Sequence, residues 1–181
     1  MSKNILLLSA TDYEHNETEI HGIPIHITGI GKSNAGTSAA RLIEQHKPDI
    51  VINFGSCGNL KNYKVGEVLE VGTCVNDLDT LGFYNPLSIQ INKDSKIKCL
   101  STDHMYDSSH NNYVDSYNDK IKECDIIEME LYAIATACIA ANVKLYGYKW
   151  VSDDGSNDEW LENAKAGFNN FKQIFKSKFI N

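Results

Sequence analysis

A near-continuous apolar run, DIVINF at residues 49–54, is the feature that most limits what this chain can fold into. A strand with so few polar residues is buried on both faces, as are the central strands of parallel sheets covered by helices. Other short apolar or β-like runs lie at 4–9, 23–28, 65–76, 125–127 and 144–151. The intervening segments carry apolar residues at helical spacing. This alternation predicts an α/β fold with a central, mostly parallel or mixed sheet flanked by helices.

The helical segments are expected at 33–46, 112–123, 130–142 and 158–178. Ser33 is a suitable N-cap for the first of them, and Pro48 follows its end, where a helix cannot continue. Residues 77–110 carry the weakest pattern. Because the chain shows neither an internal repeat nor a linker, all 181 residues are expected to form one domain.

Composition narrows the possible partners and cofactors. The net charge is −7, and no basic cluster occurs of the kind that nucleic-acid backbones require, so no nucleic-acid partner is expected. Five cysteines are spread without a CxxC pair or a histidine at metal-ligand spacing, so neither a metal nor another cofactor is expected. No apolar run approaches the ~20 residues of a membrane helix, and the N-terminal apolar run is too short for a signal peptide. The sequence therefore predicts a cytoplasmic protein with no membrane partner.

Two glycine-rich segments follow predicted strands. TGIGKSNAG at 28–36 is not a phosphate-binding P-loop, because His26 stands where the first glycine would be, and Asn34 replaces the third glycine of GxGxxG. It is either a structural turn or an anion-tolerant helix N-terminus. FGSCGNL at 54–60 is either a tight turn or a place where the backbone approaches a ligand beside the Ser56 hydroxyl.

Four carboxylates stand at predicted strand or helix ends. Glu128 and Glu130, in IIEMEL, are either first-turn acids that favour the helix dipole or acceptors for sugar hydroxyls. Glu14 is either a solvated loop acid or a carboxylate pointing into a cleft. Asp153, in VSDD, either ends a buried strand or faces a substrate. Because ligands of open α/β sheets bind beyond the carboxyl ends of the strands, their order along the chain is informative.

The order of these motifs resembles the nucleoside phosphorylase/nucleosidase superfamily, and most closely its 5′-methylthioadenosine/S-adenosylhomocysteine nucleosidase branch. TGIGKSNAG, KPDIVINFGSCGNL, VGEV, EMEL and VSDD occur in the family's sequence order. The resemblance extends from about residue 4 to the last helix, with a poor match at 77–100. Relative to usual members, the chain is shortened between Glu14 and Gly29 and again before Ser101. The implied fold is that of the nucleoside phosphorylases.

The resemblance implies a role for each matching residue. Glu14 would activate water, and Asp153, paired with Ser152, would protonate the leaving purine. Glu130 would bind ribose hydroxyls while Met129 packs on the sugar. The remaining substrate-binding positions would be Ser56, Met105, Tyr106, Ile127, Glu128 and Lys149. Ser56 would lie near the nucleophilic water, and Met105 and Tyr106 would take the places of a base-stacking aromatic residue and its neighbour. Lys149 replaces a family arginine near the water and keeps its charge without the planar fork.

The resemblance therefore implies a purine nucleoside N-glycosidase acting on methylthioadenosine, S-adenosylhomocysteine or a related adenosine derivative, with no cofactor. The phosphorylases of the superfamily hold phosphate with arginines, whereas here the turn SATDYEH has none and Arg41 is the only arginine. Water is thus the expected nucleophile. Alternatives are a phosphate-dependent purine phosphorylase and a non-catalytic nucleoside-binding domain. Family members are usually oligomers, so a homodimer is expected.

Overall fold

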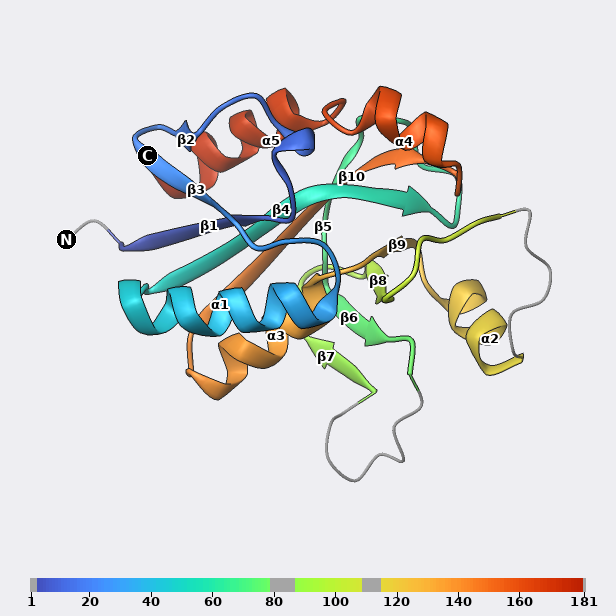
Figure 1. Ribbon diagram of the computed structural model, residues 1–181, viewed down its shortest axis with the longest axis horizontal. Helices are drawn as coiled ribbons and strands as arrows, with labels where there is room; N and C mark the ends of the chain where they lie inside the picture. Colours follow the sequence, from blue (N-terminus) through green and yellow to red (C-terminus); the bar gives the residue numbers. More distant parts are fainter. Residues whose placement is uncertain (1–2, 79–86, 109–114, 181) are drawn as a thin grey trace.

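One mixed sheet runs through the residues that the computed structural model describes, which are 3–78, 87–108 and 115–180 (Figure 1). Its strands are β1 (Ile5–Ser9), β2 (Glu19–Ile20), β3 (Ile23–Ile27), β4 (Ile50–Asn59), β5 (Val68–Glu70), β6 (Thr73–Asn76), β7 (Ser88–Gln90), β8 (Lys98–Ser101), β9 (Ile126–Glu128) and β10 (Lys144–Asp153). The order β2-β3-β1-β4-β9-β8-β6-β7 forms the main path, and β10 joins β4 to β5. The predicted α/β fold with a mixed sheet is confirmed.

The long strand β4 organises the sheet because it pairs with three neighbours. It runs parallel to β1 and β10 and pairs antiparallel with β9 at its far end. The strands β9, β8 and β6 then continue as a second parallel group. This branching brings the last residues of β4, β9 and β10 together.

Helices cover both faces of the sheet. They are α1 (Lys32–His46), α2 (Asp115–Glu123), α3 (Leu131–Ala140), α4 (Asn157–Asn163) and α5 (Phe168–Phe175), with a 3-10 turn at Asp12–Glu14 and a π-helical turn at Lys176–Ile180. In Figure 1, α1 and α3 lie on one side of the sheet and α4 and α5 on the other.

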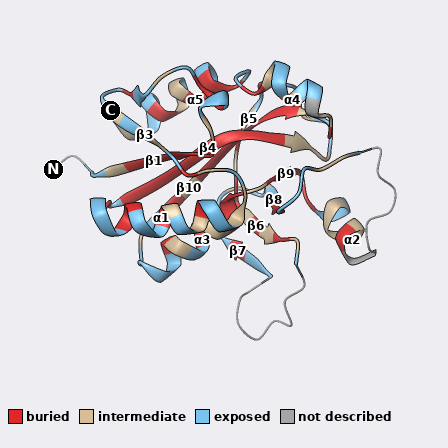
Figure 2. Ribbon diagram, in the orientation of Figure 1, coloured by how far each residue is buried: buried red, intermediate tan, exposed pale blue. Residues whose placement is uncertain are grey.

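Alternating side chains of the central strands supply the two cores, as expected from the period of two of a strand. Leu6 and Leu8 belong to the cluster under α1 and α3. Leu7 packs with Phe54 and Phe171 in the cluster under α5. Figure 2 shows β1, β4 and β10 buried along most of their length, while the helices expose their outer faces. The doubly covered strand predicted from DIVINF is therefore present.

Two expectations about element ends are wrong, and a third lies partly outside the described residues. The first helix is capped by Gly31 rather than Ser33. The segment after Phe54 is not a tight turn: β4 continues to Asn59, held in register by β10. The polar helix is present as α2, although residues 112–114 lie outside the described residues.

The expected long C-terminal helix is divided into α4 and α5. To continue α4, the carbonyl of Ala164 would have to accept a hydrogen bond from the next turn of the helix. It instead accepts the indole Nε1–H of Trp150 at 2.8 Å. Three residues later the backbone passes so close to Trp150 that a Cβ on Gly167 would lie 2.2 Å from the Trp150 Cβ. The strand β10 therefore ends α4 and sets the start of α5.

Candidate active site

A cavity lies beyond the last residues of β1, β4, β9 and β10, where ligands of α/β sheets bind. The residues predicted from the sequence that line it are Glu14, Ser56, Met105, Tyr106, Ile127, Glu128, Met129, Glu130 and Asp153. Lys149 and Ser152 are buried behind this wall and contact residues that line it. The fold thus brings together side chains that are up to 139 positions apart in the chain, from Glu14 to Asp153.

Glu14 ends the 3-10 turn after β1 and is only 4% exposed. Its Oε1 accepts hydrogen bonds from the backbone N–H and the hydroxyl of Ser56, both at 2.7 Å. Its Oε2 accepts the hydroxyl proton of Ser9 at 2.9 Å. A Cβ on Gly55 would lie 2.6 Å from Oε1, so the glycine leaves room for the carboxylate. These contacts hold Glu14 as a hydrogen-bond acceptor at the cavity wall.

Asp153 reaches the cavity because β10 contains a bulge. Val151 pairs with Cys57 and Asp153 pairs with Gly58, so Ser152 is an extra residue opposite β4. Such an insertion bends the strand and changes the direction of the next side chain. The Oδ1 of Asp153 accepts the backbone N–H of Gly155 at 2.8 Å, which fixes the carboxyl group.

The hydroxyl of buried Ser152 lies between two acceptors. It is 2.7 Å from Oδ2 of Asp153 and 3.1 Å from the carbonyl of Cys57. A hydroxyl has one proton to donate but can also accept. It can donate to an ionised Asp153, or donate to the Cys57 carbonyl while accepting from a protonated Asp153. The same geometry thus accommodates both protonation states of the aspartate.

Glu128 is held by protein groups. Its carboxylate accepts the backbone N–H groups of Glu130 and Leu131 at 3.0 and 2.8 Å and the hydroxyl of Ser101. It also pairs with Nζ of Lys149 at 2.9 Å. Burial disfavours the charged form of Lys149, yet Glu128 and the other nearby carboxylates raise the pKa of the lysine above its ordinary value. Lys149 therefore stays charged and forms an ion pair with Glu128.

Glu130 differs from Glu128 in having fewer protein partners. One oxygen, Oε1, accepts the backbone N–H of Gly31 at 2.9 Å. Burial, and then the negative charge of Glu128, raise the pKa of Glu130 to about 8, although Lys149 opposes the shift. At neutral pH the free site thus holds Glu130 largely protonated, able both to donate and to accept a hydrogen bond.

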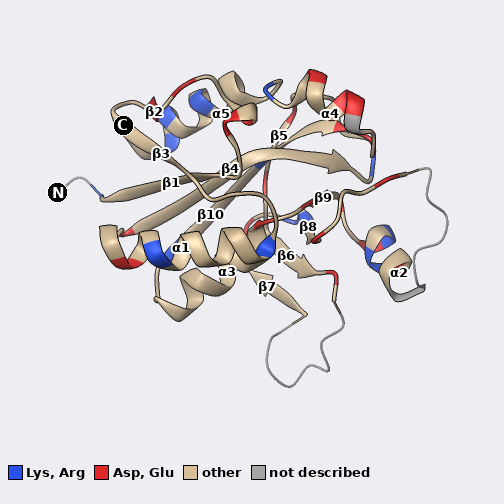
Figure 3. Cartoon of the chain, viewed as in Figure 1, with Lys and Arg blue, Asp and Glu red and all other residues tan. Residues whose placement is uncertain are grey.

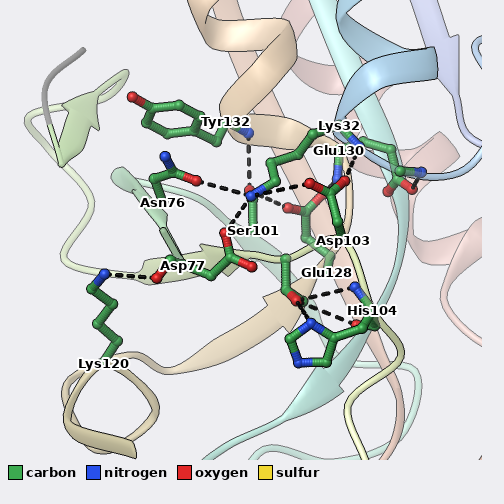
Figure 4. A network of polar contacts seen from close by, with 12 residues as sticks. Lys32, Asn76, Asp77, Ser101, Asp103, His104, Lys120, Glu128, Glu130 and Tyr132 are labelled. Atoms are coloured by element: carbon green, nitrogen blue, oxygen red, sulfur yellow. Dashed lines mark hydrogen bonds and ion pairs between the residues drawn. The ribbon is translucent and has the colours of Figure 1, made fainter. Parts of the chain in front are cut away.

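A polar network next to the cavity joins three segments around Lys32 (Figure 4). The Nζ of Lys32 donates to Asn76 at 2.9 Å and pairs with Asp77 and Asp103. The backbone N–H of Lys32 donates to Oδ1 of Asp103 at 2.9 Å. The first turn of α1 thus holds the segment that carries Met105 and Tyr106. TGIGKSNAG is therefore more than a turn, since its N–H groups bind carboxylates of the protein.

Sequence reasoning missed several residues of the cavity wall. Trp160 lines it from α4, although its spacing had placed it on the apolar stripe of a helix. Thr102 also lines it, and its hydroxyl lies 2.9 Å from Nδ1 of His104, the one histidine that the sequence singles out, which lines the cavity as well. Cys57 lines it too, but burial raises the pKa of its thiol well above the ordinary value, so the sulfur stays neutral.

The described residues contain neither a cluster of metal ligands nor a helix of membrane length. No three His, Cys, Asp or Glu side chains in that part of the chain gather in a group that could hold a metal ion. Within the same residues, no helix is both long and apolar enough to cross a membrane.

The chain is similar in sequence to known proteins. Residues 17–90 match the model of the phosphorylase superfamily. The 5′-methylthioadenosine/S-adenosylhomocysteine nucleosidase of Buchnera aphidicola is 30% identical over an alignment of 187 positions, which covers 88% of this chain and 78% of the relative.

Solved structures show the same fold. A 5′-methylthioadenosine/S-adenosylhomocysteine nucleosidase from Colwellia psychrerythraea, in complex with adenine, matches with a TM-score of 0.80 at 20% identity, covering 96% of this chain and 93% of that one. The futalosine hydrolase of Helicobacter pylori matches with a TM-score of 0.80 at 15% identity, covering 97% and 96%. The 30% identity to the Buchnera relative, over 88% of this chain and 78% of that protein, shows that the chain belongs to the 5′-methylthioadenosine/S-adenosylhomocysteine nucleosidase family.

Proposed function

We propose that this protein is a purine nucleoside N-glycosidase that uses water to cleave the base–ribose bond of 5′-methylthioadenosine, S-adenosylhomocysteine or a related adenosine derivative. The observation that carries the proposal is the pair Glu14 and Asp153, two carboxyl groups that line one cavity with different hydrogen-bond surroundings. Family membership supports the same substrate class.

Asp153 is proposed as the general acid. When the bond between C1′ and the purine nitrogen breaks, its electron pair goes to the base, and the sugar becomes cation-like. A proton delivered to the purine makes the base a better leaving group, and general acid catalysis of this kind contributes about 10²–10⁴-fold. Ser152 supports the role, because its hydroxyl can bond to the aspartate both before and after the proton leaves.

Glu14 is proposed as the general base. It accepts three hydrogen bonds, two from Ser56 and one from Ser9, and these fix the orientation of the carboxylate. Such a carboxylate can orient a water molecule, take its proton as the oxygen attacks C1′, and stabilise positive charge on the sugar. Two carboxyl groups with separate acid and base roles are also how O-glycosidases work.

Glu130 is proposed to bind the ribose hydroxyls, with Met129 against the sugar. Among the described residues, the Glu130 carboxyl group has one hydrogen-bonding partner and that of Glu128 has four, so Glu130 is the better placed to hydrogen-bond a ligand. Met105, Tyr106 and Ile127 supply apolar wall around the base. Lys149 is proposed to act through Glu128.

Water rather than phosphate is the proposed nucleophile. Among the described residues that line the cavity there is neither a lysine nor an arginine. Phosphate sites use these side chains for charge and hydrogen bonding, so the described wall lacks the groups that would hold a phosphate ion. This favours hydrolysis over the phosphorylase alternative.

The 5′ substituent is the least constrained part of the substrate. The similarity to a futalosine hydrolase at TM-score 0.80 indicates that the fold also serves another substrate.

The experiment that tests the proposed function measures the release of free base by chromatography. The substrates are methylthioadenosine, S-adenosylhomocysteine, adenosine and inosine, each with and without phosphate. Phosphate-independent adenine release with free sugar would support the proposal. Release only with phosphate, giving sugar 1-phosphate, would make it a phosphorylase. Binding of nucleosides without any release would indicate a non-catalytic module.

We also propose that the 181 residues form one domain, that it is a cytoplasmic homodimer, and that no cofactor is used. All five cysteines are buried and unpaired, which suits a reducing compartment.

The proposed dimer would form along an open groove between α1 and α3. Small and apolar residues line much of this groove and would pack against a second copy of the chain, among them Gly36, Ala40, Ala133, Ala137 and Leu78. Sedimentation of the wild type and of Ala140→Lys, which adds charge to this groove, tests the dimer. A monomeric wild type would contradict it.

A further inference from the structure

The indole of Trp160 is hydrogen-bonded to the candidate catalytic machinery. Its ring lines the cavity, and its Nε1–H donates to the Oγ of Ser56 at 2.9 Å. The same Oγ lies 2.7 Å from Oε1 of Glu14. A chain of two hydrogen bonds thus runs from Trp160 through Ser56 to Glu14.

The direction of this chain follows from the protons available. An indole N–H can only donate, and a serine hydroxyl has a single proton. Ser56 therefore accepts from Trp160, and its own proton is directed to Glu14. The backbone N–H of Ser56 donates to the same carboxylate oxygen, also at 2.7 Å. With both ends of its hydroxyl engaged, Ser56 is held in one orientation.

The placement of α4 explains how a residue so late in the chain reaches Glu14. The helix begins just after Asp153, and the side chain of its N-cap, Ser156, accepts the backbone N–H of Glu159 at 3.4 Å. Its first turn carries Asp158 and Glu159, as the helix dipole favours (Figure 3). The Trp160 ring then packs against Tyr13, with 6.2 Å between ring centroids. The helix α4 therefore connects the strand end of the proposed acid with the turn of the proposed base.

We infer that Trp160 is a positioning residue that fixes the Ser56 hydroxyl on Glu14 and so holds this carboxylate in the orientation for taking a proton from water. The inference deepens the proposed function and rests on it. Trp160 itself exchanges no proton with the substrate.

The kinetic test is a double-mutant cycle on methylthioadenosine hydrolysis. Trp160→Phe keeps an aromatic ring and removes the N–H, and is expected to lower kcat by about 2- to 10-fold, the usual worth of one hydrogen bond, with KM nearly unchanged. In a Ser56→Ala background the same substitution should have no further effect on kcat, because the two residues act as one unit. Tyr13→Phe, which alters the neighbouring ring but not the indole N–H, is the control and should keep the wild-type kcat.

A spectroscopic test does not depend on turnover. The chain has two tryptophans, and Trp150 donates its indole N–H to the Ala164 carbonyl at 2.8 Å. In a ¹H–¹⁵N spectrum, Trp160→Phe identifies one of the two indole signals. Ser56→Ala should shift that signal and speed its exchange with water, while the Trp150 signal stays in place.

These measurements separate the possible failures. An unmoved Trp160 signal in Ser56→Ala, or additive effects of the two substitutions on kcat, would overturn the inference and leave the proposed function standing. A wild type that releases no base would overturn the proposed function, and the indole signal would still decide whether Trp160 holds Ser56.

Discussion

The Nζ of Lys149 lies 2.9 Å from Oε2 of Glu128, and both side chains are only 2% exposed. The lysine stands on β10 opposite Gly55 of β4, and the glutamate ends β9, so the pair joins the strands beside the cavity. The carboxylate of Glu128 also accepts hydrogen bonds from the first backbone N–H groups of α3. The pair therefore sets the position from which Glu130 enters the site.

Removal of one partner of this pair should be severely destabilising. Lys149→Met leaves a buried carboxylate without its counter-charge, which typically costs about 3–5 kcal/mol of unfolding free energy. Lys149→Met combined with Glu128→Gln should recover part of the loss, because no buried charge of the pair remains. Urea unfolding measures both. Lys122→Met, which breaks an exposed pair with Asp119, is the control and should change stability by less than about 0.5 kcal/mol. Equal losses at the two lysines would contradict the role of burial.

Glu130 should make stability fall as pH rises. Its pKa in the folded protein is about 8, compared with an ordinary value of 4.5. Between these two pH values the folded protein keeps a proton on Glu130 that the unfolded chain has released. The contribution of protonated Glu130 to the free energy of unfolding is therefore complete below pH 4.5 and is lost as the pH rises towards 8. The slope from this group is at most about 1.4 kcal/mol per pH unit. Urea unfolding at pH 5.5, 6.5 and 7.5 should show the decline in the wild type and a flatter profile in Glu130→Gln.

The exposed residue Glu44 provides the control for this titration, since its side chain is 79% exposed. Glu44→Gln should follow the wild-type profile. If the difference in stability between the wild type and Glu130→Gln is the same at every pH, Glu130 does not titrate in this range.

The sequence was sufficient for features that depend on local pattern. The apolar run at 49–54 predicted a doubly covered strand, and the polar residues at successive strand ends predicted carboxylates at one edge of the sheet. Features that depend on register between distant strands were not predictable. The bulge at Ser152 exists because β10 slips by one residue against β4, and no local signal marks it.

The sequence pattern also did not indicate polar contacts made by side chains that fit the core or the helices. Trp160 fits an apolar helical stripe, so its pattern gave no sign of the hydrogen bond to Ser56. The division of the C-terminal helix depends on Trp150, a residue of another element whose indole takes the carbonyl of Ala164. Lys149, which the resemblance places near the water, also has its charge paired with Glu128, a contact that the sequence did not indicate.

Asp153→Asn should abolish most of the activity while preserving binding. Asparagine keeps the size and hydrogen bonds of the side chain but cannot deliver the proton, so kcat should fall by about 10²–10⁴-fold. Binding of adenine, measured by calorimetry, should be weakened much less than kcat. Asp154→Asn changes an exposed neighbour in the same way and should retain wild-type kcat. Comparable losses in the two variants would mean that Asp153 is not the acid.

Gly55→Ala should damage both the site and the fold, because the φ of Gly55 is +159°, a value that residues with a side chain rarely adopt. The added methyl group would lie 2.6 Å from Oε1 of Glu14, a distance that forces the carboxylate to move. Misplacement of a catalytic group by about 1 Å can cost 10²-fold in rate, and a loss of about that size is expected in kcat.

Gly22→Ala is the matched control. Gly22 has a φ of +78° and nothing within 4 Å of an added Cβ, so alanine there adds backbone strain without a clash at the site. Gly22→Ala should therefore lose about 1–2 kcal/mol of stability and keep kcat. Both variants should thus lose stability, and only Gly55→Ala should also lose kcat. Full activity in Gly55→Ala would show that Glu14 does not need its present position to act as the base.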